Sequence, residues 1–122
     1  MATTEASGET LAKTITENDI VLVDFWASWC GPCRTFGPIY ERASETHGDI
    51  VFTKVDTEAE QVLAGQAGIT SIPTLMAFRE GILVFSQPGA LPAPALEAVI
   101  SGVRALDMDD VRQKIAAAET GK

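Results

Sequence analysis

Cysteine and histidine are scarce in this chain of 122 residues, which has two cysteines and one histidine. Two cysteines exclude a scaffold of several disulfides. Cys30 and Cys33 stand three positions apart, so a bridge between them closes a very small loop and constrains little of the unfolded chain. A closed zinc site needs four ligands, usually Cys and His, and the only further candidate is His47 in an apparent loop. We therefore expect no metal site within one chain.

Basic residues and long apolar runs are also few. Nine Lys and Arg stand against 17 Asp and Glu, a formal net charge of −8. A nucleic acid or an anionic membrane needs a basic patch, so neither is expected as a partner. An apolar run long enough to span a membrane is missing. The opening MATTEASGET lacks the basic start and apolar core of a secretory signal, which favours a cytoplasmic location.

Strand and helix patterns alternate along the chain and predict an α/β fold. The nearly unbroken apolar run at 20–27 indicates a strand covered on both faces, and IVFTKVD at 50–56 indicates a second. Strands at 74–80 and 81–87 meet at a tight turn and should pair antiparallel. Five helices are predicted. The first covers 9–17, the second follows Cys30 and contains Pro38, and the third covers 57–66 behind a capping box of Thr57 and Glu60. The fourth lies around Leu96–Val103, and the fifth follows Asp107, which can cap it.

Both cysteines lie where a buried strand gives way to a helix. Cys30 precedes the helix, whose free N–H groups and positive dipole end favour a thiolate, the species that attacks disulfides. Cys33 lies one turn further on the same face and is expected to be the deeper, more protonated thiol. The pair suits two-step exchange, in which Cys30 forms a mixed disulfide with a target and Cys33 resolves it.

Three further residues surround this dithiol in the sequence. Asp24 is the lone charge in an apolar strand, where burial raises the pKa of a carboxyl, and it is the candidate acceptor for the proton of Cys33. Lys54 on the neighbouring strand is within reach of Asp24 and would moderate that rise. Trp29 is expected to be partly exposed beside the sulfurs and to contact a partner.

Five segments together resemble the thioredoxin family. They are DFWASWCGPC, Pro38, KVD at 54–56, SIPT at 71–74 and PGAL at 88–91, in the order and spacing of that family over roughly residues 9–103. The resemblance implies the thioredoxin fold, a central five-stranded mixed β-sheet flanked by four α-helices. With the additional short C-terminal helix, we expect a thioredoxin domain at 1–106 and a helical extension at 107–122.

The resemblance also implies a function. The chain would be a general protein-disulfide reductase that cycles Cys30 and Cys33 between dithiol and disulfide. Thioredoxin reductase, a flavoprotein that takes electrons from NADPH, would re-reduce it, and the chain itself would be a monomer that binds no cofactor. Asp24 would be the buried acid and base, with Lys54 as its neighbour. Protein disulfide substrates would lie along a groove formed by Trp29, Gly31, Pro32, Ile72, a cis Pro73, Gly89 and Ala90.

Some residues depart from the family pattern. Residues 1–7 carry little β-forming apolar sequence, so the first strand is expected to be short. Pro88 removes a backbone donor in the substrate loop. Three other functions remain open at this stage: a dedicated oxidant or isomerase, a binding or chaperone module without turnover, and a dimer that bridges an iron–sulfur cluster through Cys30.

Overall fold

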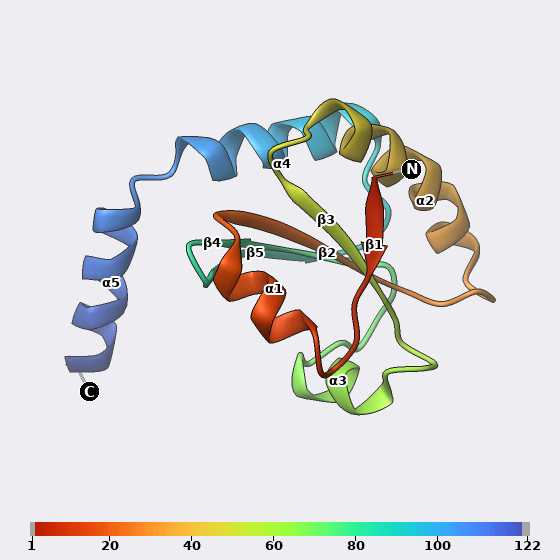
Figure 1. Cartoon of the computed structure of the whole chain (residues 1–122), viewed down its shortest axis with the longest axis horizontal. Coiled ribbons are helices and arrows are strands. Elements are labelled where there is room, and N and C mark those ends of the chain that lie inside the picture. Colours follow the sequence, from red (N-terminus) through yellow and green to blue (C-terminus); the bar gives the residue numbers. More distant parts are fainter. Residues whose placement is uncertain (1, 121–122) are drawn as a thin grey trace.

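Five strands form one mixed sheet at the centre of the computed structural model, which describes residues 2–120 (Figure 1). The strands are β1 (Thr3–Glu5), β2 (Ile20–Trp26), β3 (Val51–Asp56), β4 (Thr74–Arg79) and β5 (Ile82–Pro88). The helices are α1 (Leu11–Glu17), α2 (Gly31–Thr46), α3 (Gln61–Gln66), α4 (Ala93–Ala105) and α5 (Met108–Thr120). This is the thioredoxin fold that the resemblance implied.

The order of strands across the sheet is β1-β3-β2-β4-β5. β3 runs parallel to both β1 and β2, while β4 is antiparallel to β2 and β5 is antiparallel to β4. Helical crossovers separate the parallel strands along the chain, as parallel pairing requires. The first strand is three residues long, which confirms the expectation of a short one. β2 therefore lies at the middle of the sheet, and the dithiol follows directly after it.

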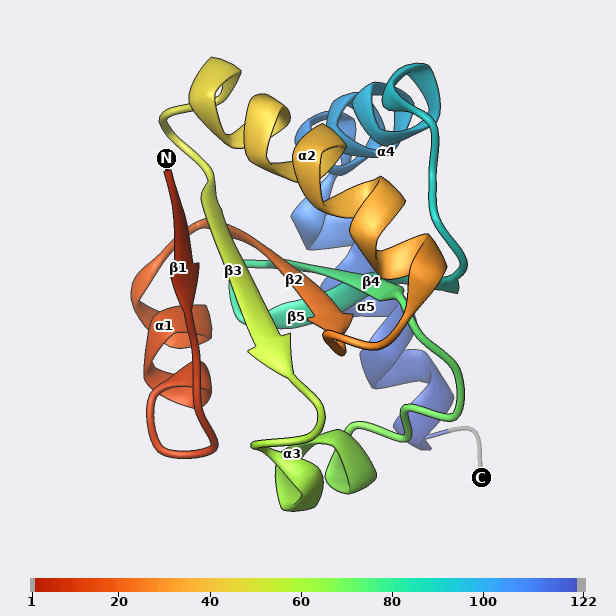
Figure 2. The same cartoon turned by 90° about the vertical axis from the view of Figure 1, so that its right-hand side faces the viewer.

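Helices cover both faces of the sheet (Figures 1 and 2). α2 and α4 lie on one face, where Phe36, Tyr40 and Ile100 join a core cluster with Leu22 and Phe52. α1 and α3 lie on the opposite face over the second cluster, whose buried members include Leu11, Val21, Val23, Phe25 and Val55 and against which Leu63 of α3 packs. Alternate residues of β2 thus reach different cores, which explains its nearly unbroken apolar sequence.

The capping box predicted at Thr57 is wrong. α3 begins at Gln61, and the Thr57 hydroxyl donates to the carbonyl oxygen of Trp26 at 3.0 Å instead. Asp56, at the end of β3, accepts the backbone N–H groups of Glu58 and Ala59 at 2.9 and 3.4 Å. Asp56 thus takes the donors that a Thr57 cap would have used: its carboxylate accepts the N–H of Ala59, and its backbone oxygen accepts that of Glu60.

His47 is not the solvated loop residue that its neighbourhood in the sequence suggested. It ends α2, and its ring lies between two side chains of α4: Nε2 is 2.8 Å from Glu97 Oε1, and Nδ1 is 3.0 Å from an amino group of Arg104. Arg104 also makes a two-pronged ion pair with Asp49. These contacts fasten the far end of α2 to α4, which the chain order alone does not reveal.

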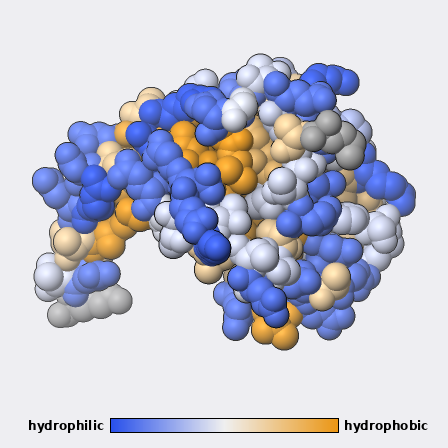
Figure 3. Space-filling model, in the orientation of Figure 1, coloured by the Kyte–Doolittle hydropathy of each residue, from blue (hydrophilic) through white to orange (hydrophobic). Residues whose placement is uncertain are grey.

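α5 projects from the body of the molecule (Figure 1). Asp107 caps it as predicted, since its carboxylate accepts the N–H groups of Asp109 and Asp110. Arg112 links it to Glu80 in the β4–β5 turn. Met108 is buried, whereas Ile115 is 39% exposed, and Figure 3 shows apolar atoms on the side of α5 that faces the sheet. In residues 2–120, none of the helices has the length and apolar character needed to cross a membrane.

Candidate functional site

Cys30 and Cys33 form a disulfide at the junction of β2 and α2. Cys30 is the N-cap of α2: its backbone is extended, and its sulfur accepts the backbone N–H of Cys33 at 3.2 Å. Pro32 occupies the first turn, where a missing N–H costs nothing. The sulfur of Cys30 therefore takes the place that a serine or aspartate side chain has in an ordinary capped helix.

Residue burial does not distinguish the two cysteines as the sequence led us to expect. Cys30 is 4% exposed and Cys33 is 5% exposed, so Cys33 is not the deeper residue. Both pack with Ala27, and the side chains of Trp26 and Ile72 lie against them. What separates the two cysteines is their hydrogen bonding, because the helix end donates to Cys30.

A loop from a distant part of the chain meets the disulfide, and a second loop is bonded to the first. The Ile72–Pro73 peptide bond is cis, and the carbonyl oxygen of Ile72 lies 3.6 Å from the sulfur of Cys30. Gly89 donates its backbone N–H to the carbonyl oxygen of Pro73 at 2.7 Å, and its φ of 101° is one that residues with a side chain rarely adopt. The loop after Pro88 thus keeps its tie to Pro73, and Ala90 lies exposed beside it.

Trp29 stands out from the surface next to the cysteines, with 64% of the residue exposed. Its indole N–H donates to a carboxylate oxygen of Glu58 in the turn before α3, which holds the ring in one orientation. Gly31 and Pro32, which follow in the sequence, are exposed as well. A hollow of about 380 Å³ lies along the ring and is lined by Trp29, Thr57, Gln61, Ala64, Gly65, Ile69, Thr70, Ser71 and Ile72.

Asp24 is buried in the middle of the sheet, with 1% of the residue exposed. Its pKa is raised from 3.8 to about 7: desolvation is the main cause, the charge of Lys54 acts in the opposite direction, and the charge of Glu5 adds to the rise. Neither carboxylate oxygen has a hydrogen-bond partner in the described part of the chain. The prediction of a buried carboxyl with a raised pKa is confirmed, and such a group exchanges a proton near neutral pH.

Lys54 is the register neighbour of Asp24 on β3. Its ammonium lies 4.8 Å from the ring centroid of Trp26, so it is held over the aromatic face beside the site. Trp26 itself is partly buried against the cysteines.

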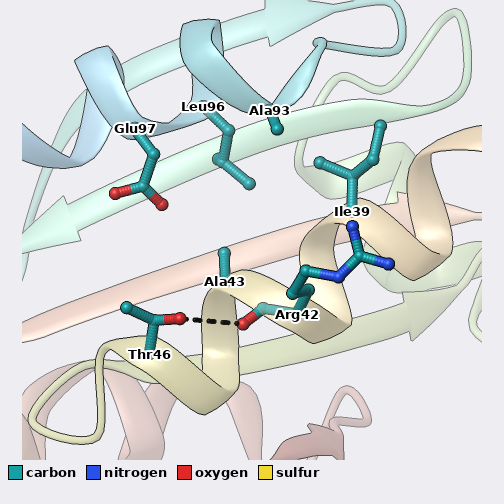
Figure 4. Close-up of a pocket in the computed structure, with 7 residues that line it drawn as sticks. All are labelled: Ile39, Arg42, Ala43, Thr46, Ala93, Leu96 and Glu97. Atoms are coloured by element: carbon teal, nitrogen blue, oxygen red, sulfur yellow. Dashed lines mark hydrogen bonds between the residues drawn. The ribbon is translucent and has the colours of Figure 1, made fainter.

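The pocket in Figure 4 is separate from this site. It lies between α2 and α4, has a volume of about 200 Å³ and is lined by Ile39, Arg42, Ala43, Thr46, Ala93, Leu96 and Glu97. The Thr46 hydroxyl donates to the backbone carbonyl of Arg42 within it. The residues expected around the dithiol are absent from its lining.

Sequence reasoning missed three residues near the site: Glu5, Tyr40 and Glu58. Tyr40 lies on the buried face of α2, where burial is the first cause that raises its pKa and the charge of Asp24 is the second. The Glu58 side chain holds Trp29, and Glu5 acts on Asp24 from two strands away. The signal for Tyr40 was its hydroxyl on an otherwise apolar face. The partners of Glu5 and Glu58 are set by tertiary contacts.

Comparisons with known proteins agree with this geometry. The family model described as Thioredoxin matches residues 2–102. A Streptomyces coelicolor protein provisionally named thioredoxin 2 is 56% identical over 115 residues, which cover 94% of this chain and 86% of that one. The thioredoxin of Bacillus subtilis is 35% identical over 83% of this chain and 97% of its own.

Solved structures give the same result. A mutant thioredoxin from Halobacterium salinarum superposes with a TM-score of 0.79 at 34% identity, covering 86% of this chain and 93% of that one. The thioredoxin of Plasmodium falciparum gives 0.76 at 35% identity, with 81% and 97% covered. The chain belongs to the thioredoxin family and is a thiol–disulfide oxidoreductase.

Proposed function

We propose that this chain is a general protein-disulfide reductase in which Cys30 is the attacking residue and Cys33 the resolving one. The observation that supports this most is the position of Cys30 at the N-cap of α2, where its sulfur accepts the N–H of Cys33. A donor and the positive end of a helix dipole favour a negative sulfur at this position over a neutral one.

The reaction has two exchanges. The Cys30 thiolate attacks one sulfur of the target disulfide, a new S–S bond forms, and the other target sulfur leaves as a thiolate that takes a proton from solvent. Cys33 then loses its proton and attacks Cys30, which forms the Cys30–Cys33 disulfide and releases the second target sulfur as a thiol. Two electrons pass to the target, and the dithiol is oxidised.

Asp24 is proposed to accept the proton of Cys33. A group with a pKa of about 7 holds and releases a proton at neutral pH with little cost in either direction. The Asp24 side chain belongs to the face of the sheet that α2 covers, since its strand neighbours Leu22 and Leu75 pack there. Lys54 is proposed to limit the rise in this pKa, because its positive charge favours the carboxylate.

Substrate binding is assigned to the exposed surface around the sulfurs. An extended segment of the target would pair with the backbone of Ile72, whose carbonyl already lies beside Cys30, and would contact the face of Trp29. The full set proposed to bind substrate is Trp29, Gly31, Pro32, Ile72, Pro73, Gly89 and Ala90.

The dithiol needs a source of electrons for further turnover. We assign this to an NADPH-dependent flavoprotein of the thioredoxin reductase class, in the cytoplasm, with the chain acting as a monomer in electron transport between that enzyme and protein disulfides. Residues 1–106 are proposed to be the redox domain, and 107–122 an extension outside its chemistry.

Insulin reduction in the presence of NADPH and a thioredoxin reductase tests this proposal. Wild type should turn over, Cys30→Ser should abolish turnover, and Cys33→Ser should accumulate covalent adducts with target proteins. An oxidant or isomerase would instead introduce or shuffle disulfides in reduced ribonuclease faster than it reduces insulin. A binding module would leave both substrates unchanged, and either result would overturn the assignment.

A further inference from the structure

A row of charged residues crosses three strands of the sheet next to the dithiol. The register pairs Glu5 of β1 with Lys54 of β3, and Lys54 with Asp24 of β2. Figure 2 shows these three strands side by side. Register partners on adjacent parallel strands direct their side chains to the same face of a sheet, so the register position of Lys54 lies between those of the two acidic residues.

The contacts of β1 fix which face this is. The Thr3 hydroxyl donates to Glu41 of α2 at 2.6 Å, so Thr3 points toward α2, and Glu5 follows two residues later on the same side. Phe52, the register partner of Thr3, belongs to the core cluster under α2. Glu5 is exposed at the edge of the sheet, while Asp24 is buried at its centre.

We propose that Glu5 is a positioning residue for the dithiol chemistry: its carboxylate competes with Asp24 for the ammonium of Lys54 and opposes a second negative charge in the same row. This rests on the proposed function, in which Asp24 accepts the proton of Cys33. Because of Glu5, Asp24 stays protonated to a higher pH, so Asp24 exchanges its proton near neutrality. The direction agrees with the charge of Glu5 raising the pKa of Asp24.

The other ionisable groups around Asp24 have partners of their own. Tyr40 of α2 is buried and donates its hydroxyl to the carbonyl oxygen of Thr53. Glu41 of α2 is held by Thr3, and its pKa is lowered first by that hydrogen bond and also by the charge of Lys54. Leu75, the register partner of Asp24 on β4, carries no charge. Lys54 and Glu5 are therefore the two charged groups of the row, and their effects on the pKa of Asp24 have opposite signs.

The size of the effect follows from the geometry of the sheet. Adjacent strands lie about 4.8 Å apart, so charges two strands apart are separated by roughly 10 Å. At the effective dielectric constants of protein surfaces and water, this corresponds to a shift of about 0.3 to 1 pH unit in the titration of Asp24. Because Glu5 is exposed, 1 M salt should reduce that shift.

The experiment follows the carboxyl carbon of Asp24 by ¹³C NMR through a pH titration of the oxidised protein, with the signal assigned by its loss in Asp24→Asn. Glu5→Gln should lower the midpoint by about 0.3 to 1 pH unit. Glu5→Asp, which keeps the charge, should retain most of the wild-type midpoint. Glu9→Gln removes the same charge from an exposed turn outside the row and should leave the midpoint unchanged.

A midpoint in Glu5→Gln within about 0.1 pH unit of wild type would overturn the proposal, as would an equal shift in Glu9→Gln. The first result means that Glu5 does not act on Asp24, and the second that only net charge matters. The titration needs no turnover, so it is separate from the test of the proposed function. If Asp24→Asn reduced insulin at the wild-type rate at every pH, the acceptor role would fail even with the midpoint shifted.

Discussion

The hydroxyl of Tyr40 donates a hydrogen bond of 2.8 Å to the carbonyl oxygen of Thr53 and ties α2 to β3. Tyr40 is fully buried, with the rings of Phe36 and Phe52 at centroid distances of 5.6 and 5.2 Å. The helix that carries the dithiol is thus anchored to the strand that carries Lys54.

Tyr40→Phe removes that bond while keeping the ring. A buried carbonyl that loses a partner typically costs about 1–2 kcal/mol, so the free energy of unfolding should fall by that amount. Urea denaturation of the oxidised protein measures it. Thr46→Val removes an exposed hydroxyl bond from the same helix and should change stability far less. Equal stability of Tyr40→Phe and wild type would show that the bond contributes nothing.

Asp24→Asn should change stability in a way that depends on pH. The folded protein keeps the proton of Asp24 up to about pH 7, whereas the unfolded chain releases it near its ordinary pKa of 3.8. The folded state therefore binds more protons between these values, and the wild-type free energy of unfolding falls as pH rises through this window.

The asparagine variant lacks this loss, so it should be more stable than wild type at pH 9, by on the order of 4 kcal/mol, and should show no such gain at pH 4. Denaturant unfolding at the two pH values measures the difference. Glu17→Gln, an exposed change on α1, serves as a control and should follow wild type. A gain of the same size at both pH values would rule out ionisation of Asp24 as the cause.

The two sulfurs of the reduced protein should differ in reactivity. Cys30 sits at the end of α2, so iodoacetamide should alkylate it in Cys33→Ser at least about 10-fold faster at pH 7 than it alkylates Cys33 in Cys30→Ser. In strong denaturant the helix end is lost, and the two rates should become equal. Two sluggish and equal rates in the folded protein would contradict the assignment of Cys30 as the nucleophile.

Removal of residues 107–122 should leave a folded and active redox domain. The truncated protein loses the burial of Met108, which costs about 2 kcal/mol, and the exposed ion pair of Arg112 with Glu80. Insulin reduction should stay within about two-fold of the full chain at 25 °C, since the dithiol and its loops are retained. An inactive but folded fragment would assign the extension a part in the reaction.

The sequence allowed most of the fold to be predicted because its signals are local. The apolar run around Asp24, the helical spacing after Cys30 and the turn at Glu80–Gly81 each depend on neighbouring residues, and the structure has strands β2, β4 and β5 and helix α2 where they were expected. Burial of Asp24 followed from the same local pattern.

The wrong predictions came from competition between neighbouring side chains for the same N–H groups and from contacts between residues far apart in the chain. Asp56 took the N–H groups that Thr57 was expected to draw toward a helix cap, and both residues are acceptable caps by sequence. Cys33 was expected to be deeper than Cys30, but the loop at Ile72, far away in the chain, covers Cys30 equally well. The row from Glu5 to Asp24 needs the strand order, which the sequence does not state.

The N-cap position of Cys30 has a practical consequence for capturing complexes. Serine is among the best capping side chains, so Cys30→Ser exchanges the reactive atom for a hydroxyl that can hold the helix end as before. The substitution therefore yields an inert copy with an undisturbed docking surface. Mixed with an oxidised target, this variant would bind without forming a mixed disulfide through position 30, so the measured affinity would be that of the noncovalent complex.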